Sequence, residues 1–359
     1  MTVDPATHPF GVYVHIPFCA SKCDYCAFAT WTDRHHLTEA YLEALALEIA
    51  RAVEAGLPLA TSIFVGGGTP SLVDPDRLMD VVAAIPTAGG AEVTVECNPD
   101  DVSDALLRPY VAAGVNRISL GVQSMASHVL GTLGRRHDRA NVERAVTSIR
   151  DAGIATFNLD LIYGAAGEST ADWAETLDAV LTLDPPHVSA YALTIEPGTP
   201  LAGRPEAHPD DDDLADKYDL ADERLVRAGR SNYEISNWAL PGHECRHNLL
   251  YWRQQDYRGF GCAAHSHEAG RRWWNVRTPD RYVELVASGA STEAAGETLD
   301  ESTRRFERLE LMLRMREGVP VDALDGRALP GLVERVADRW VLTRSGRLLA
   351  NEIATRLRV

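Results

Sequence analysis

The stretch His15-Ile16-Pro17-Phe18-Cys19-Ala20-Ser21-Lys22-Cys23-Asp24-Tyr25-Cys26-Ala27-Phe28 carries three of the six cysteines of the chain, in the spacing Cys-x3-Cys-x2-Cys. It continues from Val12–Ile16, where alternating and β-branched residues predict a strand. Three thiolates on a loop at the end of a strand can bind three irons of a cubane 4Fe–4S cluster, here through Cys19, Cys23 and Cys26. The fourth iron of such a cluster stays open to a small molecule.

A zinc site is the alternative interpretation of these cysteines. A closed structural zinc site takes four ligands, usually in two separated pairs, and the nearest candidate for a fourth ligand is His15, which points along a strand. We interpret Cys97, Cys245 and Cys262 as ordinary thiols, and a disulfide framework is not expected. A thiolate-bound cluster needs a reducing compartment. The spacing therefore favours an iron–sulfur cluster and a cytoplasmic location.

Length and charge restrict the class of protein further. The 359 residues are enough for one large α/β domain and a smaller one. No apolar run approaches the roughly 18 residues of a membrane span, and Met1–Phe10 lacks the Lys or Arg of a signal peptide. The formal net charge of −17 repels phosphate backbones and anionic membranes. We expect no nucleic-acid partner and no integral membrane protein.

Strand-like and helix-like segments alternate along the first 205 residues. The predicted strands are Val12–Ile16, Thr61–Val65, Glu92–Glu96, Asn116–Val122, Ala155–Ile162 and His187–Leu193. Apolar residues recur with helical spacing between them, and Asp138 and Ser169 are predicted helix caps. Regular βα alternation implies parallel strands. Because six strands are fewer than the eight of a closed barrel, we expect a partial (β/α)6 barrel over residues 1–205.

Glycine and polar residues follow several of these strands. The run Gly66-Gly67-Gly68-Thr69-Pro70 is either a tight turn or a loop whose backbone approaches a ligand. The polar residues at the other strand ends are Glu96, Asn98, Asp100, Gln123 and Ser124. Asp160 lies inside the apolar run of the fifth predicted strand, where a single buried carboxylate can also be a structural group satisfied by local N–H donors. The carboxyl ends of parallel barrel strands form the active face. The sequence therefore predicts a small-molecule site there.

The βα rhythm stops after residue 200. Pro205–Asp213, with four consecutive aspartates, is interpreted as a polar link before a helix at Leu214–Ala228 and not as a metal site. We assign residues 206–300 to a linker and motif region, and residues 301–359 to a smaller α+β domain. From Leu332 onward, a hairpin and a turn at Ser345-Gly346 suggest a winged-helix type. The negative charge of the chain favours a packing role for it over DNA binding.

The segment from His243 to His267 is rich in histidine and aromatic residues. Neutral imidazole is a good axial ligand of haem iron, and Tyr251 and Trp252 are flat enough to lie on a porphyrin. The alternative is a loop whose histidines form local hydrogen bonds and whose aromatic rings fill the core. On composition alone, this alternative is favoured.

Taken together, these stretches resemble the radical S-adenosylmethionine (SAM) superfamily and, within it, the HemN-like family of oxygen-independent coproporphyrinogen dehydrogenases and haem chaperones. The resemblance runs over nearly the whole chain. Besides the three cysteines, its markers are His15–Cys19, Gly66–Pro70, Gly121–Ser124, Asp160–Gly164 and Leu193–Thr199. It implies a TIM-like radical SAM barrel followed by a C-terminal α+β domain of the HemN type.

The resemblance also implies roles for individual residues. Cys19, Cys23 and Cys26 would bind the cluster, and SAM would chelate the open iron and be cleaved reductively to a 5′-deoxyadenosyl radical. The positions implied around SAM or the cluster are Tyr13, Tyr25, Phe28, Gly67, Gly68, Thr69, Glu96, Gln123, Arg135, Asp160 and Ala192.

Two features distinguish the branches of this family. The dehydrogenases usually carry one more cysteine two residues past the third, where this chain has Phe28. His247-Asn248-Leu249-Leu250-Tyr251-Trp252 matches the HNxxYW motif implicated in haem binding by the chaperones. The resemblance thus favours a haem chaperone with His247, Asn248, Tyr251 and Trp252 as haem contacts, and leaves open whether His247 ligates the iron.

This branch implies haem or porphyrin, a recipient apo-haemoprotein and a reductant protein as partners. Two enzymatic alternatives stay open, and with them whether the chain is a catalyst at all. One is radical decarboxylation of coproporphyrinogen III propionates to vinyl groups. The other is a radical methylase or cyclopropanase, which would bind a second SAM.

Overall fold

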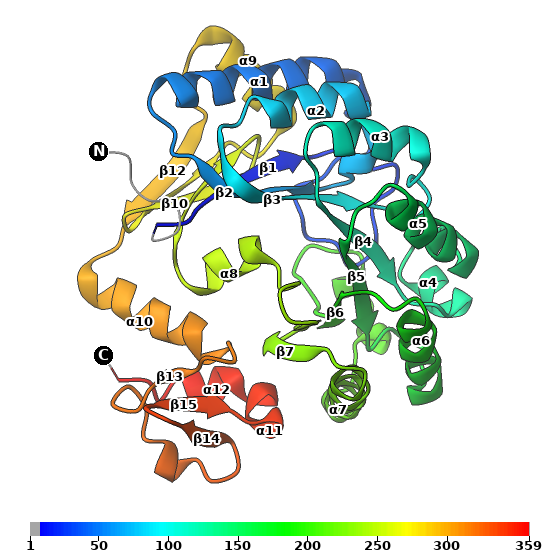
Figure 1. The fold of residues 1–359 in the computed structure, drawn as a ribbon, viewed down its shortest axis with the longest axis vertical. Helices are drawn as coiled ribbons and strands as arrows, with labels where there is room; N and C mark the ends of the chain where they lie inside the picture. Colours follow the sequence, from blue (N-terminus) through cyan, green and yellow to red (C-terminus); the bar gives the residue numbers. More distant parts are fainter. Residues whose placement is uncertain (1–7, 359) are drawn as a thin grey trace.

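The computed structural model describes residues 8–358, so most of the N-terminal stretch Met1–Phe10 lies outside the described residues. The main element is a curved sheet with six neighbouring parallel strands at its centre (Figure 1). These confirm the six predicted strands, and the largest difference in bounds is the earlier start of the third. They are β1 (Phe10–Ile16), β2 (Ala60–Gly67), β3 (Thr87–Cys97), β4 (Arg117–Gln123), β5 (Thr156–Tyr163) and β6 (His187–Ala192).

Helices follow these strands and cover the outer face of the curved sheet (Figure 1). They are α1 (Thr38–Glu54), α2 (Pro75–Ala83), α3 (Asp104–Ala112), α4 (Ser127–Thr132), α5 (Arg139–Asp151) and α6 (Thr170–Thr182). Both predicted caps are confirmed as capping boxes, with Asp138 on α5 and Ser169 on α6. The apolar stripe of each helix packs on the sheet, as Leu42, Leu45 and Ile49 of α1 do.

The sheet continues beyond the six parallel strands at both edges. Next to β6 lie β8 (Asn237–Ala239) and β7 (Ser231–Glu234). Next to β1, and parallel to it, lies β9 (Asp256–Phe260), so that Gly11 faces Tyr257. An antiparallel extension of β10 (His265–Glu268), β11 (Arg271–Asn275) and β12 (Glu293–Thr298) follows. Residues 206–300 thus supply strands to both edges of the main sheet.

Two helices of this region pack on different sides of the sheet. The short helix α8 (Arg246–Trp252) lies on the inner side of the curve, where it contacts β1 and β2 (Figure 1). The helix α9 (Pro279–Ser288) packs against α1 outside. The placement of α8 brings the predicted haem motif into the concave side of the sheet.

The acidic run is helical and not a link. Asp210 caps α7 (Asp211–Arg227), so the helix begins three residues before the predicted start at Leu214. Aspartates are favoured in the first turn because the helix dipole places partial positive charge there. Asp213 also pairs, at 2.6 Å, with the fully buried ammonium of Lys217, which donates to the backbone oxygen of Glu168 as well.

The chain ends in a small unit with an apolar core of its own. It comprises α10 (Glu301–Leu313), a sheet of β13 (Val319–Pro320), β15 (Arg339–Leu342) and β14 (Val333–Val336), and the helices α11 (Arg344–Leu348) and α12 (Ala350–Ala354). The predicted turn at Ser345-Gly346 is wrong: both residues lie in α11, because Thr343 caps that helix by accepting from the Gly346 N–H. The hairpin turns earlier, at Ala337, whose φ is 53°.

An ion-pair cluster joins this small unit to the barrel. The buried carboxylate of Asp222 on α7 lies 2.6 Å from the Arg344 guanidinium and 2.9 Å from that of Arg347, both on α11. It also accepts from the indole N–H of Trp238. These contacts hold the C-terminal unit against α7. In the described part of the chain, no helix is long and apolar enough to cross a membrane.

Two buried tyrosines offer a test of this packing. Tyr41 donates to the carbonyl of His15 and accepts from the N–H of Cys262, joining β1 to the loop after β9. The hydroxyl of Tyr110 is buried without a partner. We expect Tyr41→Phe to lower the free energy of unfolding by about 1–3 kcal/mol, because it leaves two buried groups unpaired. Tyr110→Phe should leave the free energy of unfolding unchanged. An equal loss of that free energy in both variants, measured by denaturant titration, would contradict this expectation.

Candidate functional site

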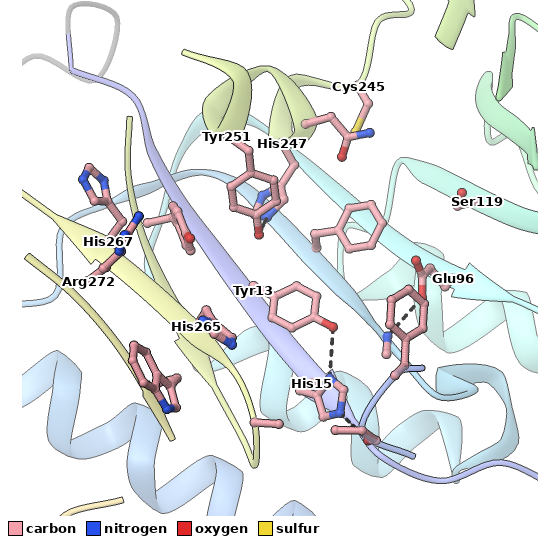
Figure 2. A pocket seen from close by; sticks show the side chains of 18 of the residues that line it. Tyr13, His15, Glu96, Ser119, Cys245, His247, Tyr251, His265, His267 and Arg272 are labelled. Carbon is pink, nitrogen blue, oxygen red and sulfur yellow. Dashed lines mark hydrogen bonds between the residues drawn. The ribbon is translucent and has the colours of Figure 1, made fainter. Parts of the chain in front are cut away.

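Two adjoining cavities lie at the inner face and the carboxyl ends of the parallel strands. The first, of about 560 Å³, is lined by the three clustered cysteines and the loops after β2, β3 and β4; we call it the cysteine cavity. The second, of about 970 Å³, is lined by the inner face of the sheet together with α8; we call it the inner cavity (Figure 2). They share Ala27, Phe28, Gly67, Glu96, Ser119, Asp160 and Tyr191.

The cysteine loop is fixed to the glycine loop by backbone hydrogen bonds. The N–H of Gly68 donates to the Ile16 carbonyl at 2.7 Å, and that of Thr69 donates to the Phe18 carbonyl at 2.8 Å. A side chain at position 68 would place its Cβ 2.6 Å from the same Phe18 oxygen. Glycine at position 68 therefore allows the close approach of these two protein segments.

The thiols are suitable ligands for a cluster. None of Cys19, Cys23 and Cys26 is in a disulfide, and all three line one cavity. Burial raises the pKa of Cys19 and of Cys26. These thiols hold their protons until a metal replaces them, as is usual when metal binding releases protons. Three thiols around a cavity of this size fit a cluster with one open iron.

His15 is not available as a fourth zinc ligand. Its Nε2 lies 2.9 Å from the carbonyl of Ala29, and its Nδ1 lies 3.0 Å from the hydroxyl of Tyr13. Both ring nitrogens are thus engaged, and burial lowers the pKa of His15 to about 4. Among residues 8–358, no three or more His, Cys, Asp or Glu side chains converge on a single ion. The hydrogen bonds of His15 thus remove the fourth ligand that the zinc interpretation considered.

Two carboxylates and a guanidinium line the cysteine cavity. Glu96 accepts from the Gly67 N–H at 3.0 Å, and Asp160 accepts from the Ser119 hydroxyl at 2.7 Å. Burial, with the nearby Asp160 charge, raises the pKa of Glu96 to about 7. Arg135 donates to the Gly121 carbonyl at 2.8 Å and places its other terminal nitrogen 3.8 Å from Cys23 Sγ. A guanidinium and carboxyl groups in one cavity fit a ligand that carries both an amino and a carboxylate group, such as the methionine part of SAM.

The other positions implied for SAM fall at the same place with one exception. Tyr25, Phe28, Thr69, Gln123 and Ala192 all line the cysteine cavity. Gln123 does so with a positive φ of 64°, where the register between β4 and β5 shifts. Tyr13 instead lines the inner cavity, where its hydroxyl bonds to His15 (Figure 2).

The HNxxYW motif forms α8 and contributes to the wall of the inner cavity. His247 is buried, with Nδ1 2.9 Å from Ser62 Oγ and Nε2 2.8 Å from the hydroxyl of Tyr251, one helical turn later. Its ring stacks on Phe64 with centroids 5.4 Å apart. Burial lowers the pKa of His247 to about 3, so it does not titrate near neutral pH. The neutral ring of His247 therefore joins β2, through Ser62, to α8, through Tyr251.

The other members of the motif are placed differently. Asn248 and Tyr251 line the inner cavity, whereas Trp252 does not. The motifs did not predict Ser62 and Glu92, which hydrogen-bond to His247, or Ser119, which lines the inner cavity. The alternation of β2, β3 and β4 could have found them, because every second residue of an inward-facing strand points to the same side.

A family model for the radical SAM superfamily matches residues 13–180. A protein from Mycobacterium tuberculosis named heme chaperone HemW is 40% identical over 369 residues, covering 97% of this chain and 95% of that protein. The chain belongs to the HemW family of radical SAM proteins. The HemW of Escherichia coli is 36% identical over 367 residues, covering 96% of this chain and 97% of its own.

A solved structure confirms the fold of this HemW-family chain. Coproporphyrinogen III oxidase (HemN) from Escherichia coli superposes with a TM-score of 0.82 over 97% of this chain and 89% of that one, at 23% identity. The α/β class and the partial radical SAM barrel predicted from the sequence are thus confirmed. Membership of the radical SAM superfamily implies a 4Fe–4S cluster and SAM as cofactors.

Proposed function

We propose that this protein is a haem chaperone, which binds haem in the inner cavity and passes it to apo-haemoproteins. The observation that carries the proposal is the position of the HNxxYW motif, whose His247, Asn248 and Tyr251 line a cavity of about 970 Å³. That volume lies at the upper end of the range for ligand pockets, ~300–1,000 Å³. The relatives named heme chaperone, 40% and 36% identical over nearly the full length, support the same function.

The cluster and SAM belong, in this proposal, to the adjoining cysteine cavity. Cys19, Cys23 and Cys26 bind the cluster, while Arg135 and the carboxylates of Glu96 and Asp160 hold SAM. When bound, they supply one-electron reductive chemistry, with the electron coming from a reductant protein. Phe28 and Tyr191 line both cavities, so occupancy of one can affect the other. A thiolate-bound cluster also places the protein in a reducing compartment, the cytoplasm.

Anaerobic reconstitution with iron and sulfide, followed by parallel assays for haem binding and porphyrinogen turnover, tests the proposal. We expect one haem per chain and no vinyl product. Tyr251→Phe removes the hydroxyl bonded to His247 and should weaken haem binding by about 2- to 10-fold, which corresponds to one hydrogen bond. Tyr110→Phe, outside both cavities, is the matched control.

The enzymatic alternatives give different products. Formation of vinyl groups with release of carbon dioxide and 5′-deoxyadenosine would replace the proposal with a coproporphyrinogen dehydrogenase. A methylated or cyclopropanated product would replace it with a radical methylase. Haem that binds but is never transferred to an apo-haemoprotein would contradict the delivery role.

A further inference from the structure

Five histidines line the inner cavity: His15, His187, His247, His265 and His267. If haem binds there, as the proposed function states, one of them is the natural axial ligand of its iron. A ligand needs a ring nitrogen with a free lone pair that the iron can reach. The hydrogen bonds of the five rings decide which side chain meets this requirement.

Three of these rings have both nitrogens engaged. His15 is bonded to Tyr13 and Ala29, and His247 is bonded to Ser62 and Tyr251. His187 is likewise held by its two partners, Asn158 and Tyr233. Any of these would have to break a buried hydrogen bond to ligate iron, which leaves its former partner unpaired.

The Nε2 nitrogen of His267 has no hydrogen-bond partner, but it is buried and does not reach the open space of the cavity. Its Nδ1 lies 3.2 Å from the carbonyl of Gln255, and its Nε2 has no partner. The side chain is only 6% exposed and the Nε2 atom is fully buried. The ring would have to rotate out of its packing against Tyr257 to reach an iron.

His265 differs from the other four. Its side chain is exposed, and within residues 8–358 its ring forms no hydrogen bond or ion pair. The ring stacks on Trp274, its partner in the register between β10 and β11, with centroids 5.6 Å apart and planes 27° apart. In Figure 2 it projects from its strand into the space beside Tyr13. Stacking fixes the plane of the imidazole while both nitrogens stay free.

We propose that His265, and not His247 of the HNxxYW motif, is the axial ligand of the haem iron in the inner cavity. This assignment rests on the proposed function and extends it to one residue. In this assignment the two sides of the cavity have different roles. His247 and Tyr251 on α8 shape the cavity, and His265 on β10 binds the iron.

The full-length reconstituted protein with two probes, ferric haem and metal-free protoporphyrin IX, tests the assignment. The wild type should bind both and show the absorption and EPR spectrum of imidazole-ligated ferric haem. His265→Ala should lose that spectrum and bind ferric haem more weakly by roughly tenfold or more, since even partners beyond the direct ligands of a metal are worth 10- to 100-fold. Its binding of the metal-free porphyrin should stay within about twofold of wild type, because no iron is involved.

Two further variants and a rescue with free imidazole make the result decisive. His36→Ala, an exposed histidine outside both cavities, should match wild type. His247→Ala should weaken both probes together, because it disturbs the wall and not the iron bond. Free imidazole added to His265→Ala should restore the spectrum.

The failures of the two proposals can be told apart. Wild-type protein that binds neither probe overturns the proposed function and this assignment with it. Wild-type protein that binds haem, with the imidazole spectrum retained in His265→Ala, overturns the assignment alone. Loss of the spectrum in His247→Ala or in His267→Ala, with His265→Ala unaffected, assigns the iron to that residue instead.

Discussion

Replacement of Cys26 by alanine is expected to abolish binding of the iron–sulfur cluster. The half-buried thiol of Cys26 lines the same cavity as those of Cys19 and Cys23, and a cubane held at three corners does not survive loss of one of them. After anaerobic reconstitution, iron and acid-labile sulfide should fall from near four per chain to a small fraction of that in Cys26→Ala. SAM binding should fall with it, because the open iron is lost.

Cys262→Ala is the matched control for this experiment. Cys262 is also a free thiol, but it is buried against Tyr41 and lines neither cavity. It should retain the full iron and sulfide content. Equal loss in both variants would point to unfolding, and full iron content in Cys26→Ala would contradict the ligand set.

Glu96→Gln is expected to stabilise the SAM-free protein at high pH. Burial, with the Asp160 charge, raises the pKa of Glu96 to about 7, above the ~4.3 of an unfolded chain. Between these values the folded protein holds a proton that the unfolded chain has released. The free energy of unfolding therefore falls as pH rises through this window, and it stays low above pH 7. Glutamine removes that cost, which amounts to about 4 kcal/mol.

Denaturant titrations with and without the substitution measure this effect. We expect the free energy of unfolding of Glu96→Gln to exceed that of wild type by up to about 4 kcal/mol near pH 8 and to match it near pH 4. Glu54→Gln, at an exposed position on α1, should change nothing at either pH. The same Glu96→Gln protein should bind SAM more weakly. A variant that is less stable than wild type near pH 8 would show that Glu96 is not a strained functional group.

The sequence predicts those parts of the site that depend on neighbouring residues. The cysteine spacing is local, and Gly67 and Gly68 sit at a strand end that periodicity alone identifies. The second edge of the sheet depends on contacts between distant segments: β9 pairs with β1, placing Tyr257 opposite Gly11. No local pattern predicts that pairing. The sequence alone therefore could not show that β10, which carries His265, forms a wall of the inner cavity.

The role of His247 shows the same limit. The motif predicts that this residue matters for haem, but its nitrogens are engaged by Tyr251, four residues away, and by Ser62, which is 185 residues distant. The bond to Ser62 engages the second ring nitrogen of His247, and a histidine with both nitrogens engaged is a structural group and not a free metal ligand. Likewise, the pairing of Asp213 with the buried ammonium of Lys217 depends on how the helix packs, which the acidic run alone does not predict.

The most direct test is an EPR measurement on the anaerobically reconstituted, reduced protein, recorded before and after SAM is added. We expect the signal of a reduced 4Fe–4S cluster, with a changed shape when SAM occupies the open iron beside Arg135 and Glu96. An absent cluster signal, a signal that SAM leaves unchanged, or a tetrahedral zinc ion on the same cysteines would contradict it.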